Sequence, residues 1–178
     1  MALNGIFSGG HGTISLAAVG SPVQQADFGA INTAYGGSIF NPVGRVEDVE
    51  ICVQTELQEY YELGSRDVRQ LVPGNIHVSG KIRRGYMNGS LLFLLLNRRA
   101  TGRASSIQPH FTMNLLLKNP DNPTDEIRVN VLSVKLENWG LHVPQTTFVM
   151  EHVTFKAAAV TVEDTDDSNA ITVAFADG

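Results

Sequence analysis

The chain has 178 residues, of which 43% are hydrophobic and 17% are charged, and its formal net charge is −5. A chain of this length forms one domain with a buried core, and its sparse charges are typical of a subunit that covers part of its surface with neighbours. The negative balance disfavours stable nucleic-acid binding, because that affinity comes from Lys and Arg displacing counterions from phosphates. Cys52 is the only cysteine, which excludes a disulfide and a cysteine-based zinc site within one chain. We expect it to fill space in the core or in an interface.

Residues 1–42 predict an extension or long loop ahead of the main domain. Residues 1–20 contain no Lys or Arg and no long apolar stretch, so we expect no signal peptide. A short strand is predicted at 13–18, and residues 21–37 are Gly-rich without a clear period. A loop of this length most often contacts a neighbour. We expect an arm that contacts a neighbouring subunit, and its larger apolar members are Val23, Phe28, Ile31 and Tyr35.

The segment 46–63 is the clearest predicted strand, because apolar and polar residues alternate along it with the period of a half-buried strand. The apolar face contains Val49, Ile51, Val53 and Leu57. The polar face is acidic, with Asp48, Glu50 and Glu56. Such a face is either an ordinary solvated surface or the wall of a channel or interface.

A basic strand follows the acidic one. Turns are predicted at Gly64–Ser65 and at Pro73–Gly74, with a short strand at 68–72 between them. The segment 75–86 then alternates again and places Lys81 and Arg83 on its polar face. The opposite signs of the two polar faces predict charge pairing across a subunit boundary.

A short helix is predicted near residues 89–98. Asn88 or Ser90 is a suitable cap at its start, and Gly102 follows its end. The helix is apolar on all sides, and one sheet covers only one of them. We therefore expect a neighbouring subunit to cover the packing residues Leu92, Phe93, Leu95 and Leu96.

The remainder of the chain predicts strands at 107–118, 126–137, 147–162 and 171–175, with 164–178 as a C-terminal tail. The alternation slips its phase between Val131 and Leu132, which predicts a β-bulge. Trp139, the only tryptophan, is expected as a core anchor. These elements predict a mainly β fold, either a sandwich or a partly open barrel, with the helix on one side.

The sequence carries no recognisable catalytic or metal-binding motif. Residues 74–81 are only faintly like a phosphate loop, since the glycine spacing is wrong and Ile82 stands where Ser or Thr is required. The five histidines are scattered without the spacing of metal ligands. We therefore expect neither an enzyme nor a cofactor. The longest apolar run, Leu91–Leu96, is far shorter than the roughly 20 residues that span a bilayer, so we expect no membrane contact.

An ordered set of short segments runs through roughly residues 43–162. It consists of Tyr61–Arg66, Val72–Gly74, Val78–Gly80, Arg84–Leu92, Phe111–Leu115, Lys118–Pro120, Leu136–Trp139 and Phe155–Ala157. Together these segments resemble the tail tube proteins of tailed bacteriophages, especially those with contractile tails. The inner tubes of contractile injection systems share that fold.

The resemblance implies a single tube-subunit domain with two packed antiparallel sheets and a flanking helix. It implies hexameric rings whose inner sheets close into one large barrel, stacked into a tube through which DNA passes. The implied place is the virion tail, assembled in the host cytoplasm. The implied partners are other copies of the chain, the sheath protein, and the tail terminator, baseplate and tape-measure proteins, with DNA only as transient cargo.

A channel for DNA should avoid a basic lining, because each contact between Lys and phosphate slows transport. We therefore expect Asp48, Glu50, Glu56 or Glu163 to contribute to an acidic lumen or interface. The main alternative is the inner tube of an injection system that carries protein effectors. A small-ligand-binding β-barrel is a further alternative from another functional class.

Overall fold

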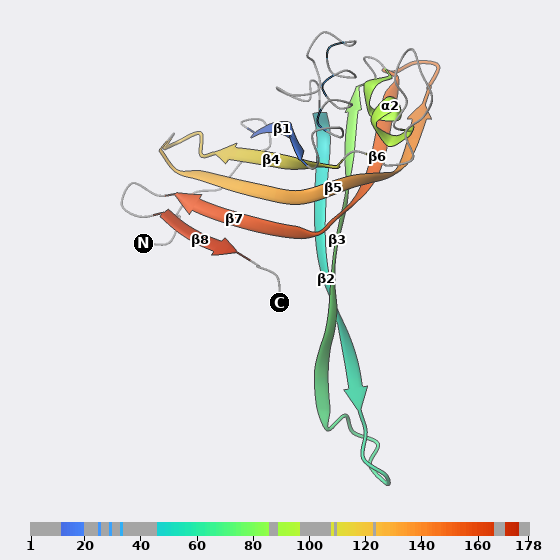
Figure 1. Ribbon diagram of the computed structural model, residues 1–178, viewed down its shortest axis with the longest axis vertical. Coiled ribbons are helices and arrows are strands. Elements are labelled where there is room, and N and C mark those ends of the chain that lie inside the picture. Colours follow the sequence, from blue (N-terminus) through green and yellow to red (C-terminus); the bar gives the residue numbers. More distant parts are fainter. Residues whose placement is uncertain are drawn as a thin grey trace.

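The computed structural model describes residues 12–19, 25, 29, 33, 46–85, 89–96, 108, 110–122, 124–165 and 170–174. The elements are β1 (Gly12–Val19), β2 (Val46–Tyr60), β3 (Gln70–Gly85), α2 (Ser90–Leu96), β4 (His110–Lys118), β5 (Glu126–His142), β6 (Met150–Ala157), β7 (Ala159–Thr165) and β8 (Ala170–Ala174). The predicted mainly β composition is confirmed, and the predicted helix is present with a length of 7 residues (Figure 1).

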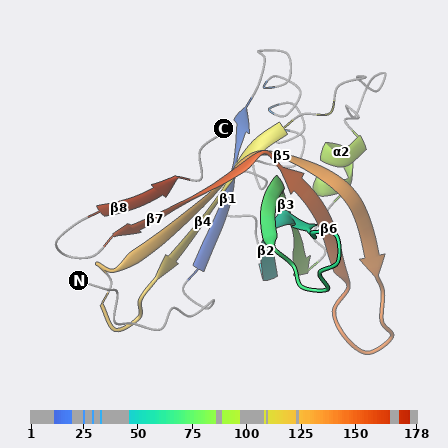
Figure 2. The ribbon, with the colours of Figure 1, turned by 90° about the horizontal axis from the view of Figure 1, so that it is seen from below.

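The strands form one sheet in the order β1-β4-β5-β6-β3-β2, with β7 pairing β5 and β8 pairing β7. Every pairing is antiparallel. The sheet curls into a half-barrel with two wings that share β5 (Figure 2). The expected packing of two separate sheets is not confirmed, because β5 runs without interruption from one wing into the other.

A β-bulge lies where β5 changes wing. Met113 pairs with Val131, but Phe111 pairs with Val134, so β5 has one residue more than β4 at this point. Ser133 within the bulge has a φ of 53°, a left-handed conformation that only a local irregularity tolerates. The predicted phase slip is therefore confirmed, and it bends the strand around the core.

The core fills the concave side of the half-barrel. β3, β5 and β6 contribute Ile82, Val134, Leu136, Val153 and Phe155, and all of these side chains are buried. Leu91 and Leu94 of α2 pack into the same cluster. The buried residues of each strand recur with period two, as the sequence predicts.

One predicted strand is two strands in the structure. Residues 147–162 are divided by Ala158, whose backbone N–H donates to the Leu132 carbonyl at 3.0 Å. β6 therefore belongs to one wing and β7 to the other. The continuous alternation of apolar residues across this corner hid it from sequence analysis.

The β2–β3 hairpin extends far beyond the half-barrel (Figure 1). We call its protruding part, residues 53–77, the hairpin arm. The turn predicted at Gly64–Ser65 is confirmed at its tip, where the Ser65 N–H donates to the Glu62 carbonyl at 3.0 Å and Gly64 has a φ of 87°. The turn predicted at Pro73–Gly74 is wrong. These residues lie inside β3 at a second bulge, because Thr55 pairs with Ile76 and Leu57 with Pro73.

Candidate assembly surface

One wing of the half-barrel consists of β2, β3, β6 and the second half of β5. We call it the four-stranded wing, and we call the side away from the core its outer face. Among the described strands, β2 pairs only with β3, and residues 135–142 of β5 pair only with β6. Each of these two edges leaves backbone N–H and C=O groups available to another strand. On the β5 edge the Leu136 carbonyl is an exception, because the Gln108 side-chain amide donates to it at 2.7 Å.

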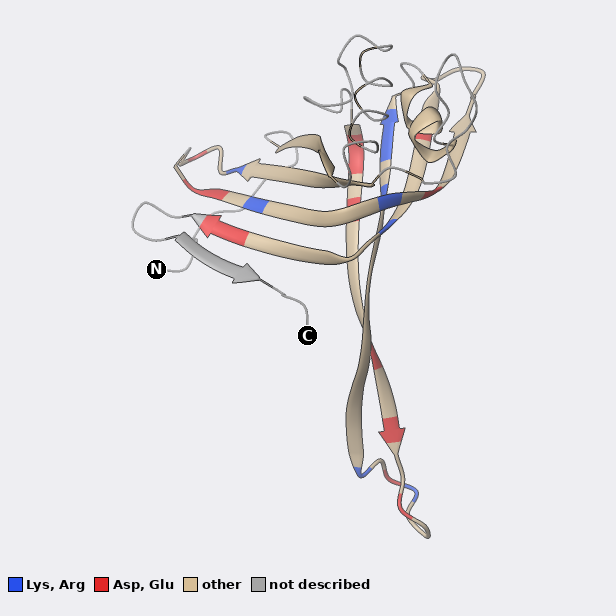
Figure 3. Cartoon of the chain, viewed as in Figure 1, with Lys and Arg blue, Asp and Glu red and all other residues tan. Residues whose placement is uncertain are grey.

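The outer face of the four-stranded wing carries cross-strand ion pairs. Between β2 and β3, Glu50 Oε2 lies 2.5 Å from Lys81 Nζ, and Glu47 Oε2 lies 3.3 Å from Arg83 Nε. The hydrogen bond to Glu50 and the charge of its carboxylate raise the pKa of Lys81. The acids lie on the edge strand and the bases on the strand inside it, as the charge colouring of β2 and β3 in Figure 3 shows.

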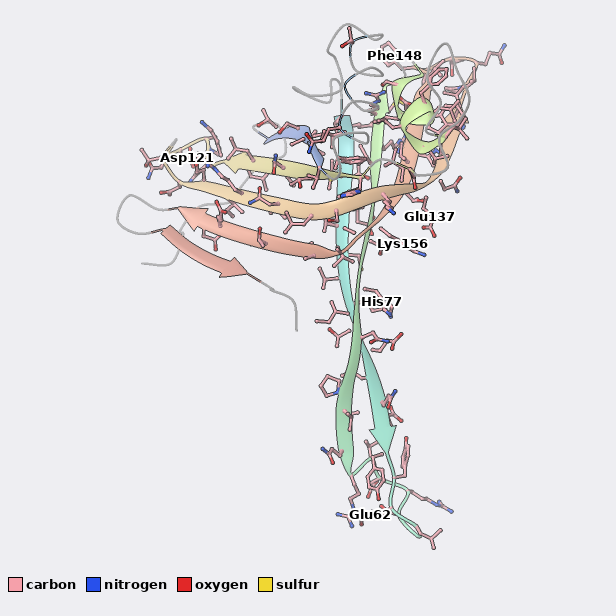
Figure 4. All side chains as sticks on the ribbon, viewed as in Figure 1. Glu62, His77, Asp121, Glu137, Phe148 and Lys156 are labelled. Carbon is pink, nitrogen blue, oxygen red and sulfur yellow. The ribbon has the colours of Figure 1, made fainter. Side chains whose placement is uncertain are left out.

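A further polar pair lies on the hairpin arm. Glu56 Oε1 lies 2.8 Å from His77 Nε2, and Asn75 Nδ2 donates to Glu56 Oε2 at 3.4 Å. The hydrogen bond with His77 lowers the pKa of Glu56. Figure 4 shows His77 partway along the arm and Glu62 at its tip, where Glu62 pairs with Arg69 at 3.3 Å.

The opposite face of the hairpin arm is apolar and exposed. By alternation this face continues the core-facing side of β2 and β3. Its members are Val53, Leu57, Leu71 and Ile76, with exposed fractions of 50%, 60%, 54% and 60%. The alternation that predicted Val53 and Leu57 to be half-buried identified the correct face, but the arm protrudes beyond the half-barrel that would cover it. Thr55 and Glu59 lie on the same face, opposite Ile76 and Leu71. Exposed apolar side chains gathered in this way are typical of an interaction site.

A buried polar network fixes α2 to the half-barrel, and sequence analysis missed it. Arg84 Nε contacts Glu151 Oε1 at 2.5 Å, and an Arg84 Nη donates to Ser90 Oγ at 3.1 Å. Trp139 Nε1 donates to Glu151 Oε2 at 2.9 Å. Arg84 is 1% exposed and Glu151 and Ser90 are fully buried. The only sequence signal is the phase, which puts Arg84 and Glu151 on the core-facing sides of β3 and β6.

The predicted site residues fall into separate places. Asp48, Glu50 and Glu56 share the outer face of β2, whereas Glu163 lies on β7 beside Asn130, whose amide donates to it at 3.4 Å. Lys81 and Arg83 already pair within their own chain. The predicted arm residues Val23, Phe28, Ile31 and Tyr35 lie outside the described residues.

Two other predicted residues have unexpected or partial burial. Cys52 is exposed on the outer face of β2, so it does not fill the core. Trp139 is half-buried and packs against the core cluster, as an anchor should. On α2, Leu92, Phe93 and Leu95 are half-buried and Leu96 is 43% exposed.

The described residues were also searched for metal sites, hollows and membrane-spanning helices. They contain no group of three or more His, Cys, Asp or Glu residues able to hold a metal ion. A hollow of about 300 Å³ lies between β1, β4 and the start of β2, with Glu47 and Asp48 at its rim. Within the same residues, no helix combines the length and apolar character needed to cross a membrane.

No protein-family model and no curated protein matches this chain. Solved structures do match. A chain of the sheath–tube complex of the extracellular contractile injection system PVC in its extended state has a TM-score of 0.58 at 14% identity, over 92% of this chain and 95% of that one. A chain of the anti-feeding prophage baseplate has a TM-score of 0.57 at 13% identity, over 91% and 97%. The SPP1 tail tube matches with a TM-score of 0.52 at 10% identity, over 97% of this chain and 81% of that one.

This chain has the fold of those tail and injection-system chains. The likeness covers nearly its whole length and includes the half-barrel.

Proposed function

We propose that the chain is the structural subunit of a tail tube, which joins side by side into rings and stacks into a hollow filament, and that it is not an enzyme. The observation that carries this proposal is the four-stranded wing with two unpaired edges, next to a hairpin arm with an uncovered apolar face. The fold shared with the SPP1 tail tube and with a sheath–tube complex supports it.

The strand directions support closure into a ring. Three antiparallel steps separate β2 from β5 across the wing, so these edge strands run in opposite directions. If β2 of one copy lies beside β5 of the next, the new pairing is antiparallel like all the others. Repeating this head-to-tail contact closes a barrel and removes every exposed edge of the wing. We propose a hexameric ring.

The hairpin arm supports stacking. It reaches beyond the half-barrel, and all its residues except Ser65 are exposed in the isolated chain. Covering the apolar face of Leu57 and Ile76 against another copy would gain roughly 1.5–3 kcal/mol for each fully buried side chain. A second, different contact of this kind turns rings into a filament. The predicted contact arm at 21–37 stays a further proposal.

The outer face of the four-stranded wing is the proposed channel wall. Its β2 strand carries Asp48, Glu50 and Glu56. Pairing with Lys81 balances the charge of Glu50, so the wall is closer to neutral than the carboxylates alone imply. A wall without surplus positive charge suits passage of DNA, which we propose as the cargo. Glu163 lies on the other wing and would belong to an interface instead.

The place and partners follow from the same proposal. A tube of this kind would form part of a virion tail and be assembled in the host cytoplasm. It would meet a sheath around it, a terminator at one end and a baseplate at the other, with a tape-measure protein inside. The likeness to injection-system chains equally supports an inner tube for protein effectors. Neighbouring capsid and terminase genes would favour the phage tail over that alternative.

Negative-stain electron microscopy of the purified chain over a concentration series tests the proposal. We expect rings or hollow tubes, with a fraction that rises with concentration. Single chains at every concentration, including after addition of preformed tube ends as seeds, would contradict a tube subunit. A small-molecule-binding barrel would then become the favoured hypothesis.

A further inference from the structure

Lys135 on the outer edge of β5 has an unfavourable electrostatic environment in the isolated chain. It lies directly opposite Lys156 on β6, and like charges in directly opposed positions destabilise a sheet. Glu137 Oε1 lies 2.8 Å from Lys156 Nζ and neutralises that lysine (Figure 4). Within the described part of the chain, no carboxylate forms an ion pair with Lys135.

The opposite edge of the same wing has surplus negative charge. Asp48 on β2 lies opposite Arg83, but Arg83 pairs with Glu47, and Asp48 forms no ion pair with any described residue. Glu56 is paired only with His77, whose ring carries a charge only when it is protonated. The two edges that the proposed ring brings together therefore have complementary unbalanced charges on the same outer face.

The register of the wing relates these residues in space. Lys135 pairs with Lys156, Lys156 with Ser79, and Ser79 with Cys52, so Lys135 and Cys52 end the same row across the wing. Asp48 and Glu56 lie four residues before and after Cys52 on β2. Each is therefore roughly 13 Å along the strand from that row.

Closing a barrel tilts its strands and staggers each against the next. A tilt of about 36° corresponds to a stagger of about one residue per strand, as in eight-stranded barrels with a shear of 8. Over the four strands of one wing this accumulates to about four residues. A ring of such wings therefore brings Lys135 level with Asp48 or with Glu56 of the next copy, depending on the direction of the stagger.

We use the word joint for the contact between β5 of one copy and β2 of the next. We propose that Lys135 fixes the register of this joint by forming an ion pair with a surplus β2 carboxylate of the next copy, Asp48 or Glu56. This inference rests on the proposed ring. In this proposal Lys135, and not Lys81 or Arg83, is the cation of the subunit boundary, because Lys81 and Arg83 already form ion pairs within their own chain.

A charge-swap experiment tests the pairing. Lys135→Glu places like charges at every joint, and we expect it to raise the protein concentration needed for assembly by at least about tenfold. Asp48→Lys combined with Glu56→Lys should do the same. An equal mixture of the two variants should assemble again, because every joint in an alternating, even-membered ring then unites opposite charges. Lys118→Glu, an equal charge change outside the wing, is the matched control and should assemble normally.

The outcomes separate this inference from the proposed function. Normal assembly of Lys135→Glu, or failure of the mixture to recover while each variant stays folded by circular dichroism, overturns the pairing and leaves the tube intact. Failure of the unmodified chain to assemble overturns both.

Disulfide cross-linking reads the register directly. In a Cys52→Ser background, Lys135→Cys is combined with Asp48→Cys or with Glu56→Cys, and assembled rings are oxidised. We expect cross-linked dimers from one of these combinations. Lys135→Cys alone, in a chain that keeps Cys52, should cross-link more weakly. Absence of dimers from both new combinations would contradict the proposed joint.

Discussion

Gly80 and Phe155 show how a single residue shapes the wing. They face each other across β3 and β6 on the core side. A Cβ added at Gly80 would lie 2.2 Å from the Glu50 carbonyl oxygen and 2.5 Å from Cζ of Phe155. The absence of a side chain here lets the Phe155 ring lie over the sheet and fill the core.

Gly80→Ala should therefore lower the free energy of unfolding by about 1–3 kcal/mol, because either the ring or the backbone must move. Ser79→Ala, on the neighbouring residue and the opposite face, is the control and should change it by less than about 0.5 kcal/mol. Urea denaturation of the unassembled chain measures both. Equal stability of the two variants would mean that Phe155 moves aside without loss.

The Arg84–Glu151 pair is the residue-scale feature with the largest expected energy. Arg84→Met leaves the buried Glu151 carboxylate without its cation and should destabilise the chain by about 3–5 kcal/mol. The double change Arg84→Met with Glu151→Leu should lose only about 1–3 kcal/mol, because the indole N–H of Trp139 loses its acceptor. Denaturation of the three proteins measures this coupling, and a double variant no more stable than Arg84→Met would argue against it.

At the scale of elements, the hairpin arm carries a side-chain contact whose strength depends on pH. The pKa of Glu56 is lowered in the folded chain by its hydrogen bond with His77. A lowered carboxyl pKa means that the contact stabilises the fold above the ordinary pKa of Glu. This stabilisation is lost as the pH falls through the lowered value.

An NMR titration of the Glu56 carboxyl should therefore show a pKa below that of an ordinary Glu. In His77→Gln it should rise toward the ordinary range. An identical Glu56 pKa in the two proteins would exclude His77 as the cause.

At the scale of the whole molecule, the arm and the half-barrel are separable. The core cluster contains no residue of the arm, so replacing residues 55–76 by a short turn should leave the half-barrel folded. The shortened chain should still form rings through its wing edges but should not stack them into tubes. Electron microscopy and sedimentation distinguish rings from tubes, and long tubes from the shortened chain would show that stacking uses another surface.

A milder version tests the apolar face alone. Leu57→Ser with Ile76→Ser should change the free energy of unfolding by less than about 1 kcal/mol, because both side chains are exposed in the single chain. It should nevertheless shorten the tubes. The matched change Gln54→Ser with Gln58→Ser, on the polar face of the arm, should not.

The sequence by itself determined most of the strands, the helix and the faces that these elements bury. Alternation of apolar and polar residues placed Ile14, Leu16, Phe111 and Met113 in the core, and the phase slip at Val131 marked the bulge in β5. These features are local, because period and turn chemistry act over a few residues. The same local signal misread Pro73–Gly74 as a turn, since a bulge and a turn share their residue types.

Only the tertiary structure decided what depends on distant parts of the chain. It showed that β5 belongs to two wings, that the β2–β3 hairpin protrudes beyond the half-barrel, and that Arg84 forms an ion pair with Glu151 in the core. It also showed that Lys81 and Arg83 are neutralised within the chain, whereas no carboxylate of the described residues pairs with Lys135. The physical reason is that burial and ion pairing are set by which strands become neighbours, and a strand's period reveals its two faces but not the neighbour that covers each of them.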